Sequence, residues 1–177
     1  MGSMFSHIGT ETWILIGIAV IIALYLWFLE RKGKRVDRID ALCETYRVLT
    51  AETLNALPDD EAVKAVVANL TAKEDKNHPD LLFTLSQLSA GRQAVYGWWI
   101  LCHEAQRSPA AVFANRNRRV REFALDGCEV LGLSVCRDAL TSTDTDRETQ
   151  LCAAIENERP LEACLRLIRD DPDSFVD

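Results

Sequence analysis

The chain has 177 residues and a formal net charge of −7, and 48% of its residues are hydrophobic. It holds only 8 glycines and 5 prolines, too little turn material for an all-β fold. Residues 36–177 carry 25 acidic and 16 basic residues, a net charge of −9. This acidity disfavours general binding to nucleic acid, although it also serves solubility alone.

The segment 13–29 predicts a single transmembrane helix after an N-terminal flank, residues 1–12. Its 17 residues carry no charge, and eleven of them are Leu, Ile, Val or Phe. A helix of this length spans about 25 Å, slightly less than a hydrocarbon core of about 30 Å. Aromatic rings suited to the two membrane interfaces are Trp13 at one end and Tyr25, Trp27 and Phe28 at the other.

A basic juxtamembrane segment, residues 30–35, follows the predicted span and contains Arg31, Lys32, Lys34 and Arg35. Basic residues beside a span stay in the cytoplasm, so we expect a single-pass protein of the cytoplasmic (inner) membrane, with the N-terminus outside and residues 36–177 in the cytoplasm. The same charges favour contact with anionic membrane lipid. Ala19 and Ala23 form a small-xxx-small pair that is compatible with a homodimer.

Three other interpretations of this segment are open. A cleaved signal peptide has its basic residues before the apolar run and small residues after it, which is the reverse of the order seen here. A buried core helix does not explain the aromatic ends or the basic block. Met1-Gly2-Ser3 with Ser6 fits a loose myristoylation pattern, or Met1–Ser3 is a cloning remnant ahead of Met4.

The remainder predicts an all-α, compact multi-helix cytoplasmic domain over residues 36–169. Val36, Ile39, Leu42, Tyr46 and Leu49 recur at spacings of three or four, which is typical of an amphipathic helix. Asp59 is the predicted N-cap of a second helix, whose apolar face contains Val63, Val66, Val67 and Leu70. No alternating pattern typical of a strand is present.

Further helices follow in order. A short one covers residues 81–88, and Ser89 caps a helix whose apolar residues, among them Val95, Trp98 and Cys102, nearly encircle its axis, so we expect it to be central. Ser108-Pro109 begins another, and residues 118–131 form the next, with Gly132 at its end. Helices over 133–140, around 151–155 and after Pro160 complete the domain. The acidic tail, residues 170–177, is predicted to be flexible.

The cysteines indicate a reducing compartment rather than a metal or disulfide framework. None forms C-x-x-C, and none is combined with histidines at zinc spacing. Most lie on predicted apolar helix faces, where cysteine acts as a small hydrophobic residue. The six are Cys43, Cys102, Cys128, Cys136, Cys152 and Cys164.

No catalytic, cofactor or metal motif is present, and we expect a protein that is not an enzyme and binds no cofactor. Cys102-His103-Glu104 names a nucleophile, a base and an acid, yet adjacent helical residues point about 100° apart and cannot form a triad. An enzyme of unrecognised type using Cys102 and His103 is retained as an alternative. The remaining histidines, His7 and His78, are too widely separated for a shared metal site.

A cluster of arginines interrupts the acidic domain: Arg116, Arg118, Arg119 and Arg121. Guanidinium groups suit phosphates, lipid headgroups and acidic partners, so the cluster is a candidate partner or anion contact. Arg118 and Glu122 stand four residues apart, so part of the cluster is equally explained by ion pairing on a solvated helix face.

Residues 88–133 resemble the DNA-mimic-protein-like helical family, bacterial domains mostly of unknown function. The resemblance rests on Leu88-Ser89, Tyr96 and Trp98, then Phe113-Ala114-Asn115, then Leu131-Gly132-Leu133. The family's N-G-G-F stretch is replaced by Gln106-Arg107-Ser108-Pro109, and Ala111 stands where a glutamine is expected. The resemblance implies an all-α domain without known catalysis and, for at least one member, an acidic surface that sequesters a DNA-binding regulator.

Together these patterns predict a membrane-anchored, non-catalytic module that binds another protein through the acidic C-terminal third or the arginine cluster. An acidic DNA-mimic regulator is the first alternative, and the Cys102/His103 enzyme is the second. Direct binding to nucleic acid is disfavoured by the acidity.

Overall fold

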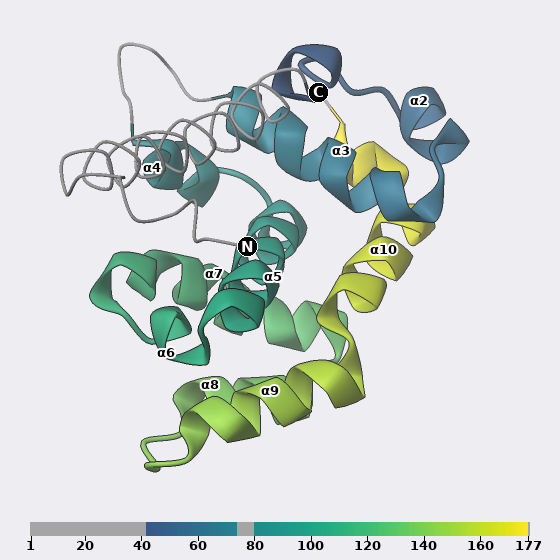
Figure 1. Ribbon diagram of the computed structural model, residues 1–177. Helices are drawn as coiled ribbons and strands as arrows, with labels where there is room; N and C mark the ends of the chain where they lie inside the picture. The colour runs from purple at the N-terminus through teal and green to yellow at the C-terminus, as the bar shows by residue number, and fades with distance from the viewer. Residues whose placement is uncertain (1–41, 74–79, 177) are drawn as a thin grey trace, which may run out of the picture. The chain divides into compact units, whose positions relative to one another are not determined.

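The computed structural model describes residues 42–73 and 80–176, and over these residues it is all-helical, with no strand, which confirms the all-α part of the predicted fold class (Figure 1). The α-helices are α2 (Ala51–Ala56), α3 (Asp59–Ala72), α4 (Leu81–Ser86), α5 (Ala90–Arg107), α6 (Pro109–Val112), α7 (Arg118–Leu131), α8 (Ser134–Thr141), α9 (Arg147–Glu158) and α10 (Pro160–Asp170). Two 3₁₀ helices, η1 (Asn115–Asn117) and η2 (Pro172–Phe175), complete the described part.

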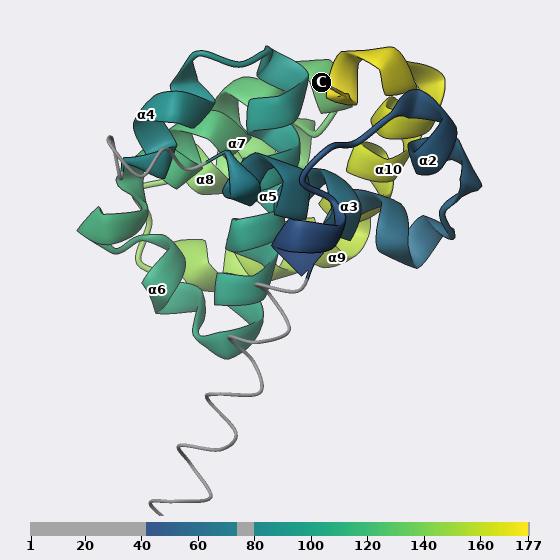
Figure 2. The ribbon, with the colours of Figure 1, turned by 90° about the horizontal axis from the view of Figure 1, so that it is seen from above.

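Helix α5 is the central element, as its sequence predicts. It packs against α3, α4, α6, α7, α10 and η2, and both views show it among its neighbours (Figures 1 and 2). The predicted cap is present, because the Ser89 side chain accepts a hydrogen bond from the Arg92 backbone nitrogen at 3.4 Å. Trp98 is the largest fully buried side chain and fills the core together with Val95 and Leu101.

Helices α5 and α7 cross at backbone contact because glycine stands at the crossing. A Cβ atom added to Gly127 would lie 2.3 Å from the Ala94 Cβ, and one added to Gly97 would lie 2.7 Å from the Ala124 backbone nitrogen. Helix α7 occupies the predicted residues and ends at Gly132, which has the left-handed φ of 70°. The close crossing fixes α7 against α5, the longest described helix.

Arg169 joins the end of α10 to the connection between α2 and α3. Its guanidinium donates to the carbonyl oxygens of Leu54 and Leu57, each at 2.7 Å, and to the Asp59 carboxylate at 2.9 Å. The side chain is only 26% exposed, so these bonds are partly shielded from water. One residue therefore links segments that are more than 100 positions apart.

Replacing Arg169 with glutamine should lower the free energy of unfolding by about 2 kcal/mol, because hydrogen bonds to charged groups contribute about 1.5–3 kcal/mol. Urea unfolding followed by far-ultraviolet circular dichroism measures the change. Arg166, an exposed arginine of the same helix, provides the matched control. Equal losses for Arg169→Gln and Arg166→Gln would contradict the assigned role.

The predicted helix over residues 36–49 ends earlier than expected. Residues 42–45 are helical, after which the chain turns. The buried Asn69 side chain of α3 donates from Nδ2 to the carbonyl oxygens of Tyr46 at 3.1 Å and Arg47 at 3.2 Å. Because these carbonyls are satisfied by a side chain from another helix, the backbone leaves the helical path here.

Two features at the start of α3 correct the sequence prediction. Helix α2 was not predicted, and it begins at a Thr50 side chain that caps the Thr53 backbone nitrogen at 3.2 Å. Asp59 is the first residue of α3 rather than its N-cap, which is Pro58. The Asp59 carboxylate is engaged by Arg169 instead of the helix end.

The C-terminal tail is packed, and the prediction of a flexible segment is wrong for residues 170–176. Phe175 is 2% exposed, and its ring lies against Gly91 of α5. Arg92 donates from Nε to the Ser174 carbonyl oxygen at 2.9 Å and from Nη2 to the Val176 carbonyl oxygen. An aromatic anchor and a guanidinium clamp thus hold an otherwise polar segment.

None of the helices within residues 42–73 and 80–176 combines the length and apolarity needed to cross a bilayer. The predicted span at 13–29, its aromatic and basic flanks and the Ala19/Ala23 pair lie outside the described residues. His7 and His78 also lie outside them.

Candidate functional site: a groove between helices α8 and α9

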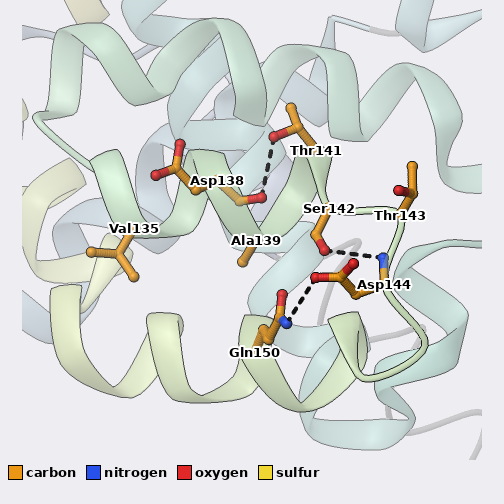
Figure 3. A pocket seen from close by; sticks show the side chains of 8 residues that line it. All are labelled: Val135, Asp138, Ala139, Thr141, Ser142, Thr143, Asp144 and Gln150. Atoms are coloured by element: carbon orange, nitrogen blue, oxygen red, sulfur yellow. Dashed lines mark hydrogen bonds between the residues drawn. The ribbon is translucent and has the colours of Figure 1, made fainter.

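An open groove lies between α8 and α9 and is bounded by the loop that joins them (Figure 3). Its volume is about 660 Å³. Helix α8 provides exposed Val135 and buried Ala139 as its apolar surface. The polar lining consists of Asp138, Thr141, Ser142, Thr143, Asp144 and Gln150.

Hydrogen bonds in the last turn of α8 and in the joining loop hold the polar end of this groove. The Asp144 backbone nitrogen donates to Ser142 Oγ at 3.2 Å, and Thr141 Oγ1 donates to the Asp138 carbonyl oxygen at 3.1 Å. Gln150 reaches from α9 toward the loop and donates to the Asp144 carboxylate at 3.4 Å (Figure 3). The described lining contains two carboxylates and no basic side chain, and one of these carboxylates, Asp138, pairs with Arg137 beside the groove at 3.7 Å.

Glu158 fixes the other end of the helix pair. Its carboxylate oxygens accept the backbone N–H groups of Val135 at 3.0 Å and Cys136 at 2.7 Å, so the last residue of α9 caps the first turn of α8. A negative charge at a helix N-terminus is stabilised by the helix dipole. Val135 is therefore both a groove residue and part of this cap.

The Glu158 cap predicts an acid-dependent loss of stability. Partial burial opposes ionisation of Glu158, but the N–H groups of Cys136 and Val135 outweigh it and the pKa lies below the usual glutamate value. Because the folded-state pKa is lowered, the stabilisation is full above the ordinary glutamate range of about 4.3 and is lost as the pH falls through the folded-state pKa. Urea unfolding from pH 7 to 3 should show a smaller decline for Glu158→Gln than for the parent. An unchanged pH dependence in Glu158→Gln would refute the cap's contribution.

The arginine cluster is dispersed into separate ion pairs. Three of the four side chains pair with carboxylates: Arg116 with Glu104 at 3.1 Å, Arg118 with Glu122 at 3.0 Å and Arg119 with Asp80 at 3.3 Å. Arg121 instead donates to the carbonyl oxygens of Val112 at 2.7 Å and Ala114 at 3.0 Å. The four guanidinium groups therefore do not form one shared site.

Cys102 and His103 do not form a reactive pair. Cys102 is 4% exposed within the hydrophobic core, and burial raises the pKa of its thiol to about 12. His103 is exposed, and its Nδ1 lies 2.7 Å from the Trp99 carbonyl oxygen while its ring lies beside the Trp99 ring. The enzyme alternative therefore gains no support from this geometry. No group of metal ligands occurs among the described residues.

Thiol labelling checks the assignment of the cysteines. Cys102, Cys128, Cys136 and Cys164 are buried, whereas Cys43 and Cys152 are half-buried. We expect iodoacetamide to modify the two half-buried thiols at least tenfold faster than Cys102, because the thiolate is the reactive form. Peptide mass spectrometry after short labelling measures the rates. Fast labelling of Cys102 in folded protein would contradict its burial.

No protein family model, no curated protein and no solved structure matches the chain. The resemblance of residues 88–133 to the DNA-mimic-protein-like family therefore stays a prediction. The groove was not predicted, because residues 141–144 have the composition of an ordinary loop and helix cap. Only the clustering of Asp144, Asp146 and Glu148 in the acidic C-terminal third pointed toward this region.

Proposed function

We propose that the protein is a membrane-anchored, non-catalytic interaction module whose acidic helical domain faces the cytoplasm. The uncharged segment 13–29 and the basic segment 30–35 support anchoring in the cytoplasmic (inner) membrane and this orientation. The observation that carries the interaction role is the groove between α8 and α9, which is open to solvent and not occupied by side chains of the described domain.

The groove fits a basic segment of a partner protein. Asp138 and Asp144 supply negative charge, and the exposed Val135 supplies an apolar contact for an aliphatic residue. The hydroxyl and amide groups between them both donate and accept hydrogen bonds, which suits a peptide backbone. Complementary charge of this kind accelerates association and selects partners.

Site-specific crosslinking in native membranes tests this proposal. A photoreactive amino acid at Val135 should form an adduct with a partner, whereas the same group at Val48, which is also exposed, should not. Replacing Asp138 and Asp144 together with asparagine should lower the adduct yield about tenfold, and added salt should lower it as well.

The matched control replaces Glu52 with glutamine and Asp170 with asparagine, two exposed carboxylates outside the groove. These changes remove the same charge and should leave the yield within about twofold. Adducts of equal yield from positions 48 and 135 would refute the groove as the docking site. So would a yield that falls in the control variant but not when Asp138 and Asp144 are replaced.

The two alternatives receive no comparable support. A DNA mimic needs a continuous array of carboxylates, whereas exposed Arg116, Arg118 and Arg119 stand among the acids of this domain. An enzyme based on Cys102 needs an accessible thiol, and that thiol is buried.

A further inference from the structure

Two arginines from different helices converge on the ring of Phe113. The guanidinium carbon of Arg147 lies 4.4 Å from the ring centre, and that of Arg121 lies 6.0 Å from it. Phe113 directly follows α6, Arg121 belongs to the start of α7, and Arg147 is the first residue of α9. All three side chains are half-buried, so three separate segments bring two positive charges to one partly shielded place.

Neither guanidinium pairs with a carboxylate of the described residues. Within residues 42–73 and 80–176, no acidic oxygen lies within 4.0 Å of Arg121 or Arg147. Arg121 uses Nη1 for the carbonyl oxygens of Val112 and Ala114. The Arg147 guanidinium stacks on Phe113 and donates to no acceptor of the described domain. An arginine carries five N–H donors, so this place offers many unused ones.

Electrostatic repulsion and burial oppose this arrangement of charges in the absence of an anion. The N-terminus of α9 disfavours a cation at Arg147, and no side chain caps it. Burial and the nearby charge of Arg147 lower the pKa of Arg121, and Arg118 adds a further positive charge. Only Glu122 acts in the opposite direction, and it is already paired with Arg118. A bound anion would offset the repulsion among these guanidinium charges and the unfavourable position of Arg147 at the helix N-terminus.

We propose that Arg121 and Arg147, oriented by Phe113, form a binding site for a phosphate monoester. The two guanidinium charges match the two negative charges of a monoester, whereas a carboxylate would neutralise only one. Stacking on Phe113 holds the Arg147 fork in one plane while leaving its N–H edges available. The site is separate from the acidic groove, whose lining includes neither arginine.

Nuclear magnetic resonance of the arginine Nε–H groups tests the site on the full chain in nonionic detergent. Sodium phosphate at pH 7.5 should shift the Arg147 and Arg121 signals saturably, and sodium chloride at equal ionic strength should not. Arg147→Gln should weaken phosphate binding about tenfold, which corresponds to about 1.4 kcal/mol. Arg147→Lys keeps the charge but loses the planar guanidinium fork, so its phosphate affinity should lie between those of the parent and Arg147→Gln.

Arg166→Gln provides the matched control, because Arg166 is an exposed arginine on α10. Its phosphate affinity should stay within about twofold of the parent. Equal weakening by Arg147→Gln and Arg166→Gln would show nonspecific charge attraction and would overturn the proposal, as would identical shifts in chloride. Spectra of each variant confirm the fold before titration.

Lipid discs distinguish the two sources of a phosphate monoester. Discs of phosphatidylcholine serve as the reference, and discs that also contain phosphatidic acid present the monoester as a headgroup. Shifts at Arg147 with phosphatidic acid support a lipid ligand, and shifts with free phosphate alone support a soluble one. Absence of Arg147 shifts in both experiments overturns the site.

Discussion

Replacing Gly127 with alanine should lower the free energy of unfolding by about 2 kcal/mol or more. The added methyl group would lie 2.3 Å from the Ala94 Cβ and 2.9 Å from its Cα, so backbone must move to admit it. Alanine gains about 1 kcal/mol of helix propensity over glycine. Overpacking costs about 1–3 kcal/mol and more where no side chain can rotate away, so the steric term wins. Urea unfolding measures the loss.

A second substitution separates the steric effect from a general effect of removing glycine. Combining Gly127→Ala with Ala94→Gly removes the shortest contact, and we expect the double variant to recover part of the lost stability. Gly132→Ala is the control, because no atom lies within 4 Å of its added Cβ and its cost comes only from the positive φ. If the double variant is less stable than Gly127→Ala alone, the close contact with Ala94 is not the cause of the lost stability.

Phe175→Ala should lower the free energy of unfolding by roughly 3–5 kcal/mol, the usual cost of truncating a buried phenylalanine. The ring is 2% exposed, and the cavity left beside Gly91 would be bounded by helices that cannot collapse freely. The same change should weaken the hydrogen bonds from Arg92 to the carbonyl oxygens of Ser174 and Val176. Urea unfolding gives the magnitude.

Phe83→Ala is the matched control for this prediction, because Phe83 is 54% exposed and its truncation should cost about 0.5 kcal/mol or less. A flexible tail would make Phe175→Ala as mild as Phe83→Ala. That outcome would restore the prediction drawn from the acidic composition of residues 170–177.

Elements with strong local signals were predicted well. Helix α7 has a clear apolar periodicity and a glycine at its left-handed end, so its residues were predicted correctly. Helix α5 has a serine cap and an apolar surface on nearly all sides, which identified it as central. In both cases the interactions that define the helix join residues close in sequence, so the spacing of those residues predicts them.

Features that depend on distant partners were missed. Helix α2 buries only Leu54, so it has no apolar periodicity to recognise. In the arginine cluster, the pairing of Arg118 with Glu122 could be predicted from their spacing, but the partners Asp80 and Glu104 are brought near by the fold alone. The convergence of Arg147 with Arg121 joins two helices and leaves no trace in the spacing of either. The groove, too, exists only once α8 and α9 are packed together.

The bond from Arg169 to the carbonyl oxygen of Leu54 can form only late in the synthesis of the chain. The two residues are 115 positions apart, so at about 5–20 residues per second the ribosome needs roughly 6–23 s to make Arg169 after Leu54. Ile168 is made just before Arg169, and Phe175, which completes the core, is made after it. During that interval the apolar faces of α3 and α5 lack their final cover. The nascent chain therefore passes through a period in which chaperones have access to surfaces that the finished domain conceals.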